Sequence, residues 1–281
     1  MNITEKQKIT SSWFRELRDK ICLEFEKIEF EFNNNQEFKF NRKKWLRSDK
    51  NKDGGYGEIS IMKGRVFEKV GVNFSEVYGE LNENFRKEIP GANVNPKFWA
   101  SGISLVAHMQ SPLVPAVHMN TRFICTEKTW FGGGSDLNPI YENEVDTNQF
   151  HQAFKKVCDE ANPEYYEKYK KWCDEYFFIK HRNVPRGVGG IFYDYLNSGN
   201  FEADFNFTKK VGLAFLDIFP KIIRRNMYNR WSEEQREYQL KKRGFYTEFN
   251  LVYDRGTRFG LMTEGNTEAI LMSLPPIAKW D

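Results

Sequence analysis

The amino-acid sequence predicts an α+β fold with a mainly antiparallel sheet. Helical stripes and β-rich runs occur in blocks, turn signals join several of the strands, and neither a GxGxxG string nor a regular βαβ alternation is present. The 281 residues, 40% of them hydrophobic, suffice for one large core, and we see no linker. We therefore expect a single domain over residues 1–281, in which residues 1–50 form a helical and polar N-terminal segment.

The first elements follow from the spacing of the apolar side chains. The first 30 residues carry an apolar stripe with a spacing of four, formed by Trp13, Leu17, Ile21 and Phe25. Such a stripe is typical of an amphipathic helix. Residues 33–55 are polar and rich in Asn and Lys. Apolar residues between 59 and 72, interrupted at Lys63-Gly64, predict two strands joined by a turn.

The middle of the chain predicts strands followed by helices. Residues 102–109 and 117–125 are β-rich, and the connector between them contains Pro112 and Pro115, which favours an antiparallel pair with a wide loop. His108 and His118 would then lie at the same end of adjacent strands. The glycines at 132–134 end an aromatic strand and would hold Asp136 on a tight loop. Residues 148–158 and 163–182 are expected to be helical, and residues 187–195 return to a strand.

The last third combines helices with a predicted hairpin. A helix is expected over residues 208–229, with a bend at Pro220, and a charged, exposed one over 233–243. Residues 246–253 and 257–262, separated by Asp254-Arg255-Gly256, give the pattern of two strands and a turn.

Composition narrows the class of protein. Lys and Arg exceed Asp and Glu by only 42 to 39, which is too even a balance for a nucleic-acid partner to be expected. No uninterrupted apolar run reaches the ~18 residues of a membrane span, and the first residues do not form a signal sequence. The four cysteines show no CxxC pair and are expected to be reduced. We expect a cytoplasmic protein with no stable membrane insertion.

One predicted strand carries three polar side chains on the same face. His118, Asn120 and Arg122 alternate, and a period of two points them in one direction. A guanidinium group suits a carboxylate, so the pattern indicates an acidic ligand, while the alternative is the polar outer face of an edge strand. Ser104 and His108 share a face of the neighbouring strand, but without a GxSxG string they make weak candidates for a nucleophile and its base.

Metal and phosphate sites are weaker possibilities. His108, His118, His151 and His181 are metal-ligand types, but their intervals of 10, 33 and 30 residues match no standard zinc signature. They could equally be hydrogen-bonded pocket or core residues. Asp136 could face a ligand or form an Asx turn. The glycine-rich residues 186–190 could form a phosphate cradle, but close packing in a sheet is the better interpretation.

Several strings together resemble the oxygen-dependent coproporphyrinogen III oxidase family. They occur in that family's order, from about residue 101 to the C-terminus. The strings are SLVAH, VHMNTRF, WFGGGSDLNPIY, KHRNVPRGVGGIF, FNLVYDRGTRFGL and TEAILMSLPP.

The resemblance implies an enzyme of haem biosynthesis that oxidatively decarboxylates two propionates of coproporphyrinogen III to vinyl groups. Dioxygen is the oxidant, and protoporphyrinogen IX, carbon dioxide and hydrogen peroxide are the products. The resemblance further implies a homodimer, a large antiparallel sheet with helices on both faces and no organic cofactor. It leaves open whether a divalent metal takes part.

Site residues carry over by motif. The resemblance implies that Asp136 accepts hydrogen bonds from the central pyrrole N–H groups, that His118 donates a proton, and that Arg122 belongs to the catalytic set. The implied substrate contacts are Ser104, Asn120, Thr121, Arg122, Arg255, Glu264, Gly265 and Asn266. The implied metal ligands are His108, His118, His151 and His181.

One departure from the family pattern keeps a second function open. Where the family commonly has an arginine after Gly-Gly or Gly-Ser, this chain has Asn266, preceded by Glu264-Gly265. A propionate would then pair with Arg255 or Arg258, or be solvated. The alternative function is a tetrapyrrole-binding protein whose catalysis is impaired, and a generic metal hydrolase is a more distant third.

Overall fold

The computed structural model describes residues 1–34, 36–49, 52–262 and 266–280. Seven strands form one antiparallel sheet in the order β1-β2-β3-β4-β5-β6-β9. Their bounds are β1 Asn41–Asp49, β2 Lys52–Met62, β3 Phe67–Glu80, β4 Lys97–Met109, β5 Ala116–Cys125, β6 Thr129–Asn138 and β9 Gly189–Leu196. The prediction of an α+β fold with a mainly antiparallel sheet is confirmed.

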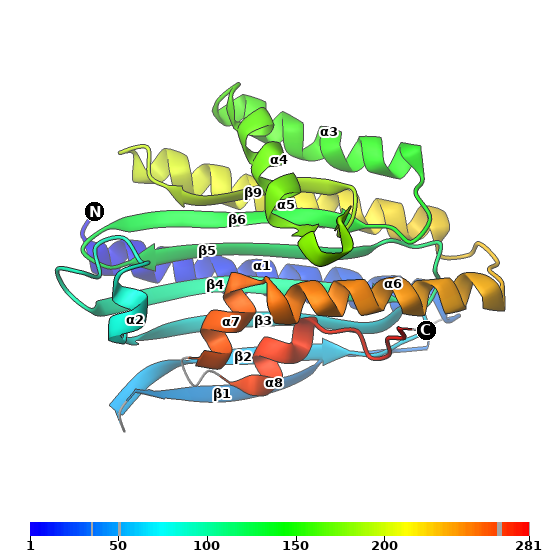
Figure 1. Cartoon of the computed structure of the whole chain (residues 1–281), viewed down its shortest axis with the longest axis horizontal. Coiled ribbons are helices and arrows are strands. Elements are labelled where there is room, and N and C mark those ends of the chain that lie inside the picture. Colours follow the sequence, from blue (N-terminus) through cyan, green and yellow to red (C-terminus); the bar gives the residue numbers. More distant parts are fainter. Residues whose placement is uncertain (35, 50–51, 263–265, 281) are drawn as a thin grey trace.

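Helices cover both faces of this sheet (Figure 1). On one face lie α1 Ile3–Phe32 and α5 Phe201–Asn226, with α3 Glu144–Ala161 packed on α5, while α4 Tyr165–Tyr176 packs on β9. On the other face lie α6 Glu233–Val252, α7 Arg255–Met262 and α8 Thr267–Ile270. The short elements are α2 Glu83–Arg86, β7 Phe178–Ile179, β8 Val184–Pro185 and the 3-10 turns η1 Lys180–Arg182 and η2 Leu271–Ser273. No helix among the described residues is long and apolar enough to span a membrane.

The main core lies between the sheet and the α1–α5 layer. Phe25 of α1 contacts Phe67 of β3 and both Phe215 and Phe219 of α5, with ring centroids 4.7–6.4 Å apart. The predicted apolar stripe of the first helix is the face that enters this core. Burial of large aromatic rings supplies much of the driving force for folding, so this face of the sheet serves packing. The opposite face is left for the polar residues of β5 and β6.

Several predictions of local structure were wrong. The helix expected over residues 163–182 ends at Tyr176 and is followed by β7 and η1. Residues 41–49 form β1, an edge strand whose largely exposed, charged side chains gave no apolar pattern. The glycines at 132–134 do not end a strand, because β6 continues through them to Asn138, and Asp136 therefore lies within the sheet and not on a loop.

The predicted C-terminal hairpin is helical. Residues 246–262 belong to α6 and α7, and the buried positions Tyr246, Phe249 and Asn250 are three and four apart, as on one side of a helix. The apparent turn at Asp254 is a helix start, since its Oδ2 accepts hydrogen bonds from the backbone N–H and the hydroxyl of Thr257.

His108 connects β4 to the C-terminal segment. Its side chain is buried, its Nε2 lies 2.9 Å from the carbonyl oxygen of Ser273, and its ring packs edge-on against Tyr246. A carbonyl oxygen only accepts, so Nε2 carries the proton and donates. Burial, aided by the nearby Arg243 charge, lowers the pKa of His108 to about 3. This histidine is therefore a neutral structural donor at neutral pH.

His108 is expected to make folding stability sensitive to mild acid. Its pKa in the folded state lies below the ordinary value of 6.5, so the stability is present above pH 6.5 and is lost as the pH falls toward 3. Between pH 7 and pH 5 its share of the loss should be about 2 kcal/mol. His108→Gln keeps a donor without the titration, so denaturant unfolding at both pH values should show a smaller loss than in the wild type. The comparison at pH 7 measures any packing cost, and an unchanged loss in the variant would refute the assignment.

Candidate active site

His118 lies at the centre of a polar cluster on the face opposite the core. In the sheet it stands beside Asp136 of β6, and its Nδ1 is 2.9 Å from Asp136 Oδ1. Its Nε2 is 3.4 Å from the Nδ2 of Asn120, two residues along β5. An amide nitrogen only donates, so Nε2 accepts and Nδ1 carries the proton donated to Asp136. The imidazole is thus held in one tautomer, with the Nε2 lone pair directed away from Asp136.

The Asp136 carboxylate is buried and surrounded by protein donors. Its side chain is 1% exposed. Besides His118, it accepts hydrogen bonds from Arg186, whose Nη2 is 2.8 Å from each oxygen, and from Asn138 Nδ2 at 3.0 Å. Burial alone would raise the pKa of Asp136, but the Arg186 charge and the His118 hydrogen bond outweigh it and lower the pKa to about 2. Asp136 is therefore ionised at any physiological pH.

Arg186 is the site residue that the sequence interpretation missed. Its side chain is 3% exposed, and its guanidinium lies 4.0, 4.7 and 4.8 Å from the ring centroids of Phe177, Tyr246 and Phe249. Nη1 donates to Asn250 Oδ1 at 3.1 Å. Burial lowers the pKa of this arginine, but Asp136, together with Tyr246 and Asp254, raises it overall, so the charge is retained. The glycine-rich residues 186–190 had been assigned to close packing, and only the fold shows that the leading arginine reaches Asp136.

Arg122 carries a second ion pair further along β5. Its Nη2 is 2.7 Å from Asp194 Oδ2, and the Trp130 indole donates to Asp194 Oδ1 at 3.2 Å. Burial lowers the pKa of Arg122, but Asp194, together with the nearby Tyr176 and Asp254, raises it overall. The two side chains of this ion pair lie close to Gly132. A Cβ atom at position 132 would lie 2.7 Å from Asp194 Oδ1 and 2.9 Å from Arg122 Nε. Glycine at 132 is thus required by this pair.

The alternation along β5 places Asn120 on the polar face, as predicted, but it places Thr121 on the opposite face. Asn120 stands between Ser104 of β4 and Gly134 of β6, so small side chains flank it on the polar face. Thr121 was predicted to contact the same substrate, but it is fully buried and points to the opposite face, as strand alternation requires. Thr121 is therefore not part of this set.

Two buried polar atoms of β5 on the face that carries His118 lack hydrogen-bond partners within the described part of the chain, as does Asn138 Oδ1 beside Asp136. The two on β5 are Asn120 Oδ1 and Arg122 Nε. Buried polar atoms are nearly always paired in folded proteins, so such orphans indicate a partner that the protein itself does not supply. One is an acceptor and the other a donor, and both lie on the face that carries His118.

The four histidines are not brought together. His151 lies between the Tyr166 hydroxyl and the Val188 carbonyl oxygen, both at 3.0 Å, and exposed His181 lies between the Tyr253 hydroxyl and Glu248. His108 donates to Ser273, as described above. No group of three or more His, Cys, Asp or Glu side chains within the described ranges has metal-binding geometry. The predicted four-histidine metal site is therefore wrong, and we derive no chemical step through a metal.

Two of the C-terminal candidates make local contacts of their own. Arg255 is exposed at the start of α7, with its guanidinium 5.1 Å from the Tyr176 ring centroid. The Asn266 side chain caps α8 by accepting a hydrogen bond from the Ala269 N–H at 2.9 Å. Glu264 and Gly265 fall outside the described residues.

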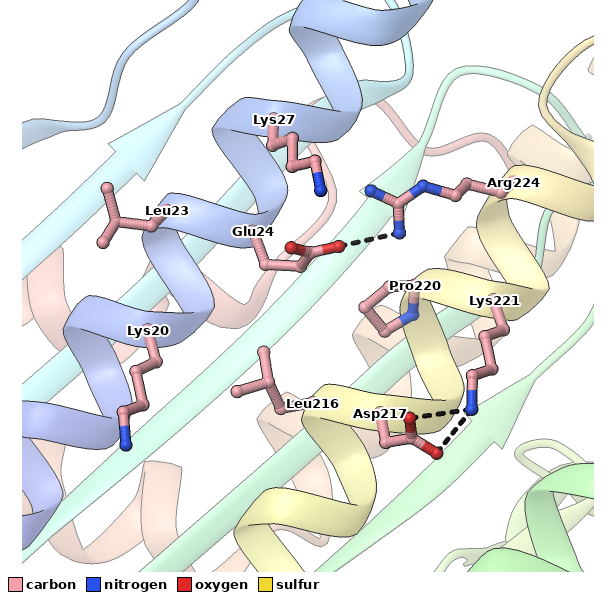
Figure 2. Close-up of a pocket in the computed structure, with 9 residues that line it drawn as sticks. All are labelled: Lys20, Leu23, Glu24, Lys27, Leu216, Asp217, Pro220, Lys221 and Arg224. Atoms are coloured by element: carbon pink, nitrogen blue, oxygen red, sulfur yellow. Dashed lines mark hydrogen bonds and ion pairs between the residues drawn. The ribbon is translucent and has the colours of Figure 1, made fainter.

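The α1–α5 surface has a groove of about 520 Å³ (Figure 2). It lies across the sheet from His118, and its charges are paired locally, for example Arg224 with Glu24 and Lys221 with Asp217, each at 2.7 Å. The groove does not contain the residues of the polar cluster. Its volume is therefore no guide to the position of the candidate active site.

Comparisons with known proteins identify the family of this chain. The family model described as "Coproporphyrinogen III oxidase" matches residues 9–281. A protein of Rickettsia bellii (strain RML369-C), named oxygen-dependent coproporphyrinogen-III oxidase, is 60% identical over 98% of this chain and 99% of its own length. Proteins with the same name from Rickettsia akari (strain Hartford) and Rickettsia africae (strain ESF-5) are each 59% identical, over 99% and 100% of both chains respectively. With its fold, its polar cluster and these relatives, the chain belongs to the coproporphyrinogen III oxidase family.

Proposed function

We propose that this protein converts two propionate side chains of coproporphyrinogen III to vinyl groups, using dioxygen as the oxidant and giving protoporphyrinogen IX. The observation that carries the proposal is the cluster of His118, Asp136 and Arg186 in a chain of this family. The orphaned donor of Arg122 suits a propionate, and the orphaned acceptor of Asn120 suits an N–H group of the macrocycle.

For each propionate, a C–C bond to the carboxylate breaks and carbon dioxide leaves. The electron pair of that bond forms the vinyl double bond as the neighbouring carbon loses a hydrogen together with its C–H bonding pair. That pair is the two electrons that reduce dioxygen, and the hydrogen's proton with one further proton completes hydrogen peroxide. The chain must therefore accept and return protons at the reacting edge of the ring. His118 Nε2 is suited to this role, because the contact from Asn120 Nδ2 to its lone pair is long, at 3.4 Å, and the Asp136 carboxylate stabilises the imidazolium that forms.

We further propose that Asp136 acts through His118. The family resemblance implied direct hydrogen bonds from pyrrole N–H groups, but both Asp136 oxygens already accept bonds from protein donors. A carboxylate so placed fixes the imidazole tautomer and offsets the positive charge that the imidazole gains. Arg122, with Ser104 and Asn120 nearby, is left to bind and orient the substrate.

The remaining assignments are proposals of the same kind. We propose a single-domain, cytoplasmic homodimer that uses no organic cofactor and needs no metal held by the four histidines, with Arg255 and Asn266 among its substrate contacts. Four buried, free cysteines agree with a reducing compartment. Light scattering of the purified protein tests the dimer.

Turnover by metal-stripped protein tests the function directly. Coproporphyrinogen III incubated with the protein without oxygen should remain unchanged, and admission of oxygen should yield the divinyl product with two peroxides per macrocycle. Tight binding of the macrocycle without any vinyl product would instead support the impaired tetrapyrrole-binding protein. Activity that returns only with added metal ion would contradict the metal-free proposal.

Asp136→Asn should lower kcat by about 100-fold or more, with a smaller change in KM, because the imidazolium loses its compensating charge. Steady-state kinetics across pH 6–9 would measure the effect. Asp159→Asn, at an exposed carboxylate paired with Lys155, is the matched control and should behave as the wild type.

The single Asp136 variant leaves Arg186 buried without its counter-ion, which could unfold the protein. The double variant Asp136→Asn/Arg186→Gln removes both charges and should be more stable than the single variant in thermal unfolding, yet equally slow. A near-normal kcat in a folded Asp136 variant would refute the role given to this residue.

A further inference from the structure

Asp194 holds Arg122 through a local distortion of the sheet. Between the pairs Phe131–Leu196 and Gly133–Tyr193, the single residue Gly132 of β6 faces two residues of β9, Asp194 and Tyr195. This is a β-bulge, a device that re-aims a side chain next to functional sites. Tyr195 has a φ of +57°, a left-handed conformation that costs a non-glycine residue energy.

The distortion positions the Asp194 carboxylate. Its Oδ1 accepts the backbone N–H of Tyr195 at 3.0 Å and the indole N–H of Trp130 at 3.2 Å, which leaves Oδ2 for Arg122 at 2.7 Å. The Asp194 side chain is 8% exposed, whereas that of Arg122 is 30% exposed. The carboxylate is thus fixed on the more buried side of the pair, and Arg122 is the more exposed partner.

The pair has an electrostatic consequence for any anionic ligand. A carboxylate that reaches Arg122 meets a guanidinium whose positive charge is already offset by Asp194 a few ångströms away. Its attraction is weaker than that of an unpaired arginine, but the direction of the available N–H groups is fixed. Arg122 can therefore orient the ligand carboxylate without binding it tightly.

We propose that Asp194 is a positioning residue that aims Arg122 at a substrate carboxylate and limits how tightly Arg122 holds it. The inference rests on the proposed function, because it takes a propionate-bearing macrocycle as the ligand. A product that retains two carboxylates must leave after each cycle, and an uncompensated arginine would slow its release.

The test measures binding without turnover, using oxidised coproporphyrin, which is fluorescent and cannot be decarboxylated by the proposed reaction. Asp194→Asn keeps the size and an acceptor oxygen but removes the charge. It should lower the Kd for the tetracarboxylate by about threefold at low ionic strength. The gain should disappear near about 0.5 M salt. The tetramethyl ester, in the same cosolvent, should bind the variant and the wild type equally.

Two controls separate charge from disturbance of the fold. Asp217→Asn makes the same change of charge on the exposed surface of α5 and should not alter either Kd. Asp194→Glu keeps the charge but moves the carboxylate, so affinity should stay within about twofold of the wild type while kcat falls. If Asp194→Asn does not fold, the affinity and kcat of Asp194→Glu test the positioning role of Asp194.

Several results would overturn the proposal. These are unchanged or weaker binding of the tetracarboxylate by Asp194→Asn, an equal shift for the ester, or equal tightening by Asp194→Glu. Because binding is measured with an unreactive porphyrin, these results do not depend on whether the protein turns over coproporphyrinogen. A failure of the oxidase assay would overturn the proposed function and leave the binding result to be judged separately.

Discussion

The buried ion pair between Arg186 and Asp136 is the interaction on which the site depends. Removing two charges from water costs several kcal/mol per ion, and the cost is offset only when geometry and hydrogen bonding are nearly complete. Here the carboxylate has donors on both oxygens, and the guanidinium has Asn250 and three aromatic rings around it. Satisfying the pair therefore requires β6, the segment before β9, and α6 to be correctly assembled together.

This requirement connects folding to chemistry. The pair keeps Asp136 ionised, the ionised carboxylate fixes the proton of His118 on Nδ1, and the lone pair of Nε2 is thereby directed to the polar face. A neutral Asp136 could not hold that tautomer in the same way. Arg122 and Asp194 repeat the arrangement nearby, but with a more exposed cation, which suits an arginine that binds a ligand rather than one that holds a carboxylate.

Short-range patterns in the sequence predicted much of the sheet but not the contacts that define the site. The alternation of His118, Asn120 and Arg122 and the pairing of their strand with residues 102–109 follow from local periodicity, and both are present in the structure. Arg186 and Asp194 were missed because they lie 50 and 72 residues from their partners, and no local pattern encodes those distances. The motif strings identified the family without revealing these partners.

The errors at residues 246–262 and at Asp136 have a related cause. Aromatic and β-branched residues around Tyr246 favour a strand locally. In the structure they form a helix, and Tyr246 on this helix packs against Arg186, so tertiary packing overrides the local preference. Glycines at 132–134 normally interrupt a strand, whereas here β6 retains them because the Arg122–Asp194 pair and the neighbouring backbone occupy the space of their side chains.

The central claim, that buried Asp136 fixes the proton of His118, is tested most directly by ¹⁵N NMR of the imidazole nitrogens. With four histidines in the chain, His118→Gln assigns the signals. At neutral pH we predict a protonated Nδ1 and an unprotonated Nε2 for His118, and loss of this preference in folded Asp136→Asn. A proton on Nε2 in the wild-type protein, or a tautomer that does not respond to Asp136→Asn, would contradict the account.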